Sequence, residues 1–231
     1  MSSAPVIATI SVKERFYTYN VSTEIVIITT NTIKDPILSV SDLQESEALN
    51  QEIFNTAIKL IKEYHDLSTT TLVLVGDLYG ESYVNNGKRI EIKGKTGRVN
   101  YDYLKINDLP RLIVYGNHDL PNSNLVRDQM ISTQNGTTIA GVDYIISSQY
   151  PTFLKDATTT LKMTPTVFVS HDTPLLTGNS RGQLQLTKLV KQYRPKVHIF
   201  GHCHLPEPIS IEDGILFVNC DARFILLLPS N

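Results

Sequence analysis

Short, mostly apolar segments recur from residue 37 onward, and they limit the possible folds more than any other feature of this chain. Each is four or five residues long and lacks the apolar–polar alternation of a strand that faces water on one side. We expect them to be strands buried on both faces: Ile37–Val40, Thr71–Val75, Leu112–Tyr115, Val167–Ser170, Val197–Phe200 and Ile215–Val218. A sheet of such strands must be covered on both sides by other layers.

Two longer amphipathic segments are candidates for the covering helices. In residues 45–64, apolar side chains such as Leu49, Ile53 and Ala57 recur at spacings of three and four and therefore share one helical face. Residues 182–193 repeat this pattern, and Pro195 follows as a helix stop. Strands that alternate with helices predict an α/β fold.

The first 36 residues differ from the rest of the chain. The stretch up to about Thr32 is rich in Val, Ile, Thr and Tyr, which is typical of strands, of a hairpin or of a sheet edge, and Pro36 then interrupts it. We therefore predict an N-terminal β-rich extension, residues 1–36, packed on a main domain formed by residues 37–231.

Composition and charge exclude several classes of protein. A hydrophobic content of 41% with 19% charged residues is ordinary for a soluble globular chain. The net charge of -2 argues against a nucleic-acid-binding protein, which needs a basic face, but it allows a small phosphate-bearing substrate. The start of the chain lacks the pattern of a signal peptide, and the apolar run Phe224–Leu228 is too short to cross a membrane. With only two cysteines, we expect a cytoplasmic protein without disulfides.

Polar residues of metal-binding types follow five of the predicted strands. In α/β sheets ligands bind beyond the carboxyl ends of the strands, so these residues are expected to meet at one edge. Carboxylate, amide and imidazole groups suit hard or borderline divalent ions, and two such ions can hold the attacking and leaving oxygens of an in-line displacement. In chain order the residues are Asp42 and Gln44, Asp77, Asn117 with His118 and Asp119, His171, and His202 with His204.

The motifs GD, GNHD, a lone His and GHCH, in that order, resemble those of the calcineurin-like metallophosphoesterase superfamily. The resemblance runs from about Ile37 to Asp221. It implies a four-layer αββα sandwich with a dinuclear metal site at one rim. It also implies two divalent metal ions as cofactors, from among Mn, Fe, Zn and Mg.

The resemblance implies a role for each motif residue. Asp77 would bridge the two ions. The first ion would also take Asp42 and His204, and the second would take Asn117, His171 and His202. His118 would protonate the leaving alkoxide or stabilise the transition state, and Asp119 would orient His118. The implied reaction is hydrolysis of phosphate mono- or diesters by a metal-activated hydroxide, with a small phosphate ester or a nucleotide as substrate.

One position departs from the family pattern. The first motif is usually Asp-x-His, whereas this chain has Asp42-Leu43-Gln44. Gln44 still offers a carbonyl oxygen, which is a harder and weaker donor than imidazole, so we expect looser binding of the first ion and a preference for Mn²⁺ or Fe²⁺ over Zn²⁺, with manganese favoured. A second alignment is possible, in which Ile25–Thr32 is the first strand and Thr30 and Thr32 take the places of Asp and His.

Two further questions stay open at the level of sequence. Residues 79–110 contain a strong turn signal at Asn85-Asn86-Gly87 and are expected to form a hairpin, either a solvated one or a flap that contacts substrate through Tyr79, Lys88 and Arg89. The alternative to an active enzyme is a scaffold or interaction protein that keeps the fold but has lost catalysis. The weakly acidic composition does not support a third candidate, a nuclease.

Overall fold

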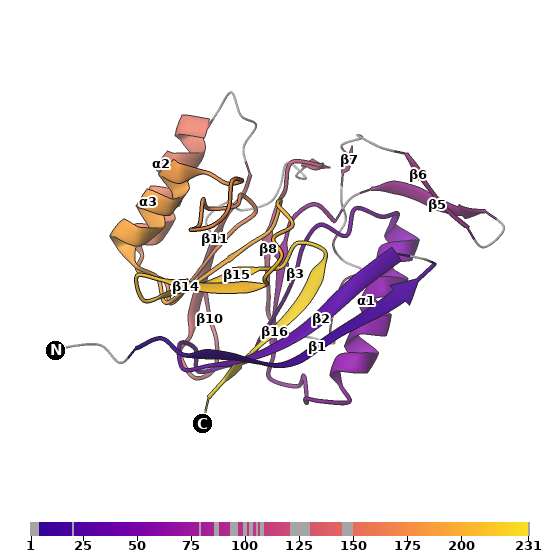
Figure 1. Ribbon diagram of the computed structural model, residues 1–231, viewed down its shortest axis with the longest axis horizontal. Coiled ribbons are helices and arrows are strands. Elements are labelled where there is room, and N and C mark those ends of the chain that lie inside the picture. Colours follow the sequence, from indigo (N-terminus) through magenta and orange to yellow (C-terminus); the bar gives the residue numbers. More distant parts are fainter. Residues whose placement is uncertain are drawn as a thin grey trace.

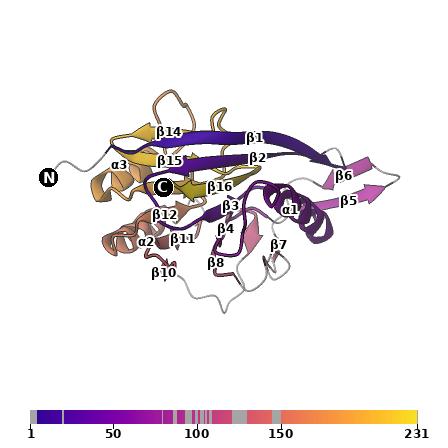
Figure 2. The ribbon, with the colours of Figure 1, turned by 90° about the horizontal axis from the view of Figure 1, so that it is seen from below.

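The computed structural model describes residues 5–19, 21–78, 80–85, 88–92, 97–98, 101, 104, 106, 109–120, 130–144 and 150–230. For residues 81–85, 88–92, 97–98 and 120 it describes the backbone only. Two six-stranded sheets form the centre of the structure, with helices on their outer sides (Figures 1 and 2).

The first sheet has the order β1-β2-β16-β3-β4-β8. Its strands are β1 (Ala8–Thr18), β2 (Val21–Thr30), β16 (Arg223–Pro229), β3 (Ile37–Val40), β4 (Thr71–Val75) and β8 (Arg111–Val114). Strands β3, β4 and β8 are parallel, so their carboxyl ends lie at one edge. Within the N-terminal β-rich segment, β1 and β2 pair antiparallel, and β2 joins this sheet through its parallel pairing with β16.

The second sheet has the order β10-β11-β12-β13-β15-β14. Its strands are β10 (Met130–Ser132), β11 (Thr138–Val142), β12 (Val167–Ser170), β13 (Val197–Phe200), β15 (Ile215–Asn219) and β14 (Ile209–Glu212). Strands β11, β12, β13 and β15 are parallel, whereas β10 and β14 form antiparallel edges.

The helices cover the two outer faces. Helix α1 (Glu47–Ile61) packs on the first sheet, while α2 (Tyr150–Lys162) and α3 (Leu184–Tyr193) lie together on the second (Figures 1 and 2). A core of Val, Ile and Leu side chains fills the space between the sheets, with Val73 and Val169 as examples from either side. The layers are therefore helix, sheet, sheet and helix, as the family resemblance implied. None of the helices in the described ranges is long and apolar enough to cross a bilayer.

Two small β pairs complete the described secondary structure. Strands β5 (Glu81–Asn85) and β6 (Lys88–Ile92) form an antiparallel hairpin, which confirms the hairpin predicted there. It projects from the body beside α1 in Figure 2. Strands β7 (Gly97–Arg98) and β9 (Asp119–Leu120) pair in parallel. Tyr79 and the side chains of Lys88 and Arg89, considered as substrate contacts, lie outside the described residues.

The sequence did not predict helix α2. Its buried residues Phe153, Ala157, Thr160 and Leu161 do follow helical spacing, but three consecutive threonines, which favour strands, obscure the pattern. Two of these threonines are accommodated because their hydroxyls donate to carbonyls four residues earlier, Thr158 to Leu154 and Thr159 to Lys155.

Candidate metal centre

The carboxyl ends of strands from both sheets meet at one edge of the sandwich. Ser41 and Asp42 follow β3, Gly76 and Asp77 follow β4, and Asn117 follows β8 in the first sheet; His171 and His202 follow β12 and β13 in the second. A hydrogen bond joins the two groups, because the ring nitrogen Nδ1 of His171 lies 2.8 Å from the carbonyl oxygen of Val75.

The alternative alignment of the first motif is excluded by this topology. Strand β2 runs parallel to β16, and β16 runs antiparallel to β3. Thr30, at the end of β2, therefore lies at the opposite edge of the sheet from Asp42. Asp42 lies beside the GD loop instead, since its amide donates to the carbonyl of Gly76 over 3.0 Å.

Three of the predicted ligands form a compact group. Ligand atoms of Asp77, His171 and His202 lie within 4.8 Å of one another. Asn117 joins them, because its Oδ1 is 3.0 Å from His171 Nε2, and Asp77 Oδ2 is 3.3 Å from the same nitrogen. Four residues of types that bind divalent ions thus converge from β4, β8, β12 and β13.

The orientation of His171 suits a metal ion. A carbonyl oxygen can only accept, so the bond to Val75 places a proton on Nδ1 and leaves Nε2 to face the oxygens of Asn117 and Asp77. With His171 neutral, its Nε2 and the oxygens of Asn117 and Asp77 bring three acceptor atoms together, an arrangement that only a cation or a shared proton can stabilise. Metal-binding histidines are commonly fixed by such a bond from their other nitrogen.

The charges at this edge also favour a bound cation. Burial opposes an imidazolium at His171, but Asp42 and Asp77 outweigh it and raise the pKa of His171 to about 10. Burial raises the pKa of Asp42 to about 8, with attraction from His171 and repulsion from Asp221 acting in opposite directions. Burial also acts on Asp77, yet the bond to His171 keeps its pKa below the usual value. The buried carboxylates thus require a positive charge beside them, which a proton on His171 or a divalent ion can provide.

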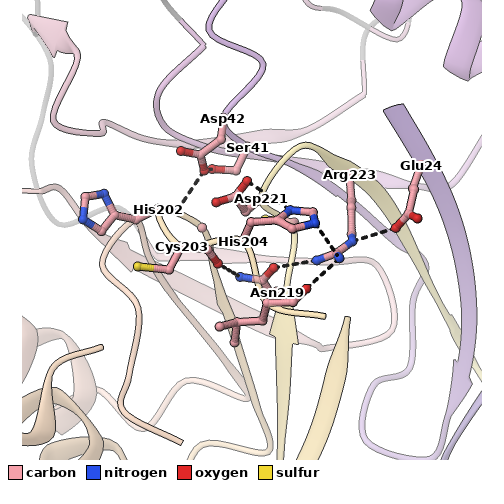
Figure 3. A network of polar contacts seen from close by, with 12 residues as sticks. Glu24, Ser41, Asp42, His202, Cys203, His204, Asn219, Asp221 and Arg223 are labelled. Atoms are coloured by element: carbon pink, nitrogen blue, oxygen red, sulfur yellow. Dashed lines mark hydrogen bonds and ion pairs between the residues drawn. The ribbon is translucent and has the colours of Figure 1, made fainter. Parts of the chain in front are cut away.

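Asp42 is held by its neighbours from both sheets. Its Oδ2 accepts from the hydroxyl of Ser41 in a short contact and from the backbone amide of His202 over 2.9 Å (Figure 3). A β-carbon added at Gly201 would lie 2.5 Å from this oxygen, so the GHCH loop can approach Asp42 only because residue 201 is glycine.

The backbone is strained where the candidate residues lie. Asp42, Gln44, Asp77 and His202 have φ angles of 56°, 50°, 51° and 68°, in the left-handed region that non-glycine residues seldom adopt. Such conformations cost about 1–3 kcal/mol each and cluster at functional sites, because the surrounding structure must hold them in place. Because these four strained residues lie at one edge, we infer that this edge has a functional role.

The GNHD loop wraps around Asp77. The amide of His118 donates to Asp77 Oδ1 over 2.7 Å, and His118 Nε2 lies 3.9 Å from Asp77 Oδ2, with 30% of the His118 side chain exposed. Asp119, which is predicted to orient His118, also supports this loop. Its Oδ2 accepts from the amides of Asp77 and Gly116 and from the hydroxyl of Tyr101, over 2.7, 2.9 and 2.5 Å.

Gln44 lies next to the compact group, and His204 is not part of it. The amide of Gln44 donates to the carbonyl of Asp77 over 3.1 Å, which places Gln44 next to the site through its backbone. His204 extends from the GHCH loop with 59% of its side chain exposed, and its Nδ1 is 3.6 Å from Asp221 Oδ1 (Figure 3). Its Nε2 lies 3.3 Å from the guanidinium of Arg223.

Sequence reasoning missed several residues that shape this edge. Tyr144 follows β11, and its ring centre lies 5.9 Å from those of both His171 and His202. Tyr101 supports Asp119, and Asp221 and Arg223 contact His204. No motif marks these residues. Asp221 could have been suspected, because it follows the predicted strand Ile215–Val218 as the other candidates follow theirs.

Comparisons with known proteins agree with the fold and motifs. The sequence profile of the calcineurin-like phosphoesterase family matches residues 35–206. The chain therefore belongs to the calcineurin-like phosphoesterase family, whose members typically use divalent metals. No curated protein matches the sequence significantly.

Solved structures with this fold include TT1561 of Thermus thermophilus, which has a TM-score of 0.58 and 14% sequence identity and covers 82% of this chain and 91% of its own. At this identity the likeness bears on the fold alone. Vps29 of Chaetomium thermophilum also aligns, with a TM-score of 0.39 and 16% identity over 82% of this chain and 70% of its own. A Vps29 single mutant from Entamoeba histolytica aligns with a TM-score of 0.37 and 16% identity, over 80% of this chain and 72% of its own.

Proposed function

We propose that this chain is a metal-dependent phosphoesterase that hydrolyses small mono- or diesters of phosphate, nucleotides included. The observation that carries the proposal is the convergence of Asp77 Oδ2, Asn117 Oδ1 and His171 Nε2, with the His171 ring fixed by Val75. Family membership supports the same class of reaction.

Each residue would have a defined task. One ion would be held by Asn117, His171 and His202, the other by Asp42, Gln44 and His204, and both by Asp77. Bound divalent ions supply a hydroxide nucleophile at neutral pH and offset the charge of the phosphate. His118 is the partly exposed group beside Asp77, so it is placed to give a proton or a hydrogen bond to the departing oxygen.

Manganese is the ion that we favour, since oxygen ligands suit it better than they suit zinc. The free thiols of Cys203 and Cys220 fit a reducing cytoplasm.

Hydrolysis assays with metal-stripped protein test the proposal. p-Nitrophenyl phosphate and bis-p-nitrophenyl phosphate would be offered with Mn²⁺, Mg²⁺, Zn²⁺ or Ni²⁺ restored. We expect metal-dependent turnover that Asp77→Ala abolishes and His118→Ala lowers by about 100-fold or more. His65→Ala is the control, because His65 lies beyond the far end of α1 from the site, and it should match the wild type.

The outcome also decides between the enzyme and a scaffold. A folded protein that turns over neither ester with any metal would contradict the proposal and favour a scaffold or interaction role. Where turnover is found, the preferred ester separates a monoesterase from a diesterase.

A further inference from the structure

Tyr144 lies at the edge of the sandwich where the candidate ligands meet. It follows β11, and Val142, the last residue of that strand, pairs with Ser170, the residue before His171. The backbone of Tyr144 is also tied to the first sheet, because its amide donates to the carbonyl of Tyr115 over 2.9 Å. Tyr115 directly precedes the GNHD loop. Both sheets therefore fix the position of Tyr144 beside the metal centre.

The Tyr144 ring packs against two imidazoles of the compact group. Its centre lies 5.9 Å from the ring centres of both His171 and His202, and the two imidazole centres are 5.1 Å apart. The plane of the Tyr144 ring makes an angle of 88° with the His171 ring but only 30° with the His202 ring. Aromatic rings attract one another in edge-to-face and offset-stacked arrangements at such separations. The three rings thus support one another.

The two imidazoles are held in different ways. Nδ1 of His171 donates to the Val75 carbonyl over 2.8 Å, and this bond fixes the ring. His202 donates to Asp42 through its backbone amide, whereas none of the residues that the structure describes hydrogen-bonds to its imidazole. Metal-binding histidines usually have a hydrogen bond from their second nitrogen, which sets the orientation of the ring. In the described part of the chain, the orientation of the His202 ring therefore depends on packing against Tyr144 and His171.

We propose that Tyr144 is a positioning residue of the metal centre, whose ring keeps the His202 imidazole directed towards Asp77. This inference rests on the proposed function. The ligand atoms of Asp77, His171 and His202 lie within 4.8 Å of one another, a spacing that depends on the orientation of the His202 ring. Because His202 is exposed, its ring would be free to rotate without Tyr144, and an ion would have to immobilise it on binding.

The contact lies between ring planes, so the ring of Tyr144 and not its hydroxyl should carry the effect. Tyr144→Phe keeps the ring and removes the hydroxyl, whereas Tyr144→Leu removes the ring. Loss of a group that orients a metal ligand typically lowers metal affinity by about 10- to 100-fold. A contact between rings is weaker than a hydrogen bond to a charged group, so we expect a loss at the lower end of this range, about 10-fold.

Manganese titrations of the full chain test the inference without a substrate. The signal of free Mn²⁺ in electron paramagnetic resonance gives the number and affinity of the ions that the metal-stripped protein binds. Tyr144→Leu, Tyr144→Phe and His202→Ala are compared with the double variant that combines Tyr144→Leu with His202→Ala. If Tyr144 acts through His202, its loss should have no effect once the imidazole is gone. Melting in EDTA checks that each variant folds.

Tyr193→Leu is the matched control. Tyr193 is a partly buried tyrosine that packs against apolar side chains, and it is the last residue of α3. The chain then leads into the start of β13, so Tyr193 lies near the opposite edge of the sheet from His202, which follows the end of that strand. This variant should bind Mn²⁺ as the wild type does.

We expect Tyr144→Leu to bind one of two ions about 10-fold more weakly, and Tyr144→Phe to keep the wild-type affinity. The ions that His202→Ala still binds should bind equally tightly in the double variant. Unchanged affinity in Tyr144→Leu, an equal loss in Tyr144→Phe, or a further loss in the double variant would overturn the inference and leave the proposed function standing. A folded wild type that binds no ion would refute the proposed function as well.

Discussion

Replacing Gly116 by alanine tests how closely the two loops must approach at the metal centre. A β-carbon at residue 116 would lie 2.1 Å from Asp77 Oδ1 and 2.5 Å from the Asp77 amide nitrogen, whereas ordinary contacts begin at 3.4 Å. The Asp77 carboxylate would therefore have to retreat by more than about 1 Å, and a displacement of that size costs about 100-fold in rate. We expect Gly116→Ala to lower kcat/KM for the preferred ester by about 100-fold.

Gly136→Ala is the matched control. No atom lies within 4 Å of the β-carbon that it adds, although its φ of +88° imposes a backbone strain of about 1 kcal/mol. We expect normal activity with a melting temperature lower by a few degrees. Steady-state rates measured below the melting temperature of both variants provide the comparison. Wild-type activity in Gly116→Ala would refute the geometry assigned to Asp77.

Three further predictions concern buried groups around the site. Burial lowers the pKa of His198 to about 3, whereas the pKa of this residue in the unfolded chain is near 6.5, so on acidification the unfolded chain takes up the proton first. This uptake should lower the unfolding free energy by about 2 kcal/mol at pH 5. In urea titrations at pH 7.5 and 5, His198→Gln should abolish that loss. Tyr101→Phe removes a hydrogen bond to the buried Asp119 carboxylate and should lower the unfolding free energy by about 2 kcal/mol. A loss below about 0.5 kcal/mol, which is usual at surface positions, would contradict that bond. Arg223→Met should lower the unfolding free energy by about 3–5 kcal/mol, because it leaves buried partners unpaired. Arg15→Met, at the exposed end of the same ion network, should lower it by less than about 1 kcal/mol. Equal losses in denaturant titrations would count against the buried network.

The sequence predicted the parts of the fold that obey a simple pattern. Strands β3, β4, β12 and β13 begin and end where their apolar runs do, since a strand buried on both faces leaves an uninterrupted signal. The edge strands β10 and β14 were missed, because their partly exposed side chains give no such run. Helix α2 was missed because its threonines favour a strand until their hydroxyls bond to the backbone.

The candidate site divides in the same way. Asp77, Asn117, His171 and His202 could be recognised because each follows a predicted strand in the order that the family motifs have, and the structure brings them together. Which side chains compete for a ring nitrogen could not be predicted from the sequence. The bond between Arg223 and His204, and the position of Asp221 beside Ser41, depend on the packing of β15 and β16 against the end of β3. These contacts join residues far apart in the chain, so no local pattern records them.

Turnover measured against the number of bound manganese ions tests the central claim most directly. Metal-stripped protein would receive Mn²⁺ in steps, and bound ion and hydrolysis of bis-p-nitrophenyl phosphate or p-nitrophenyl phosphate would be recorded at each step. If two ions act together, turnover should rise chiefly as the second ion binds and should return to zero on chelation. Full turnover without metal, or none with two ions bound, would contradict a dinuclear phosphoesterase.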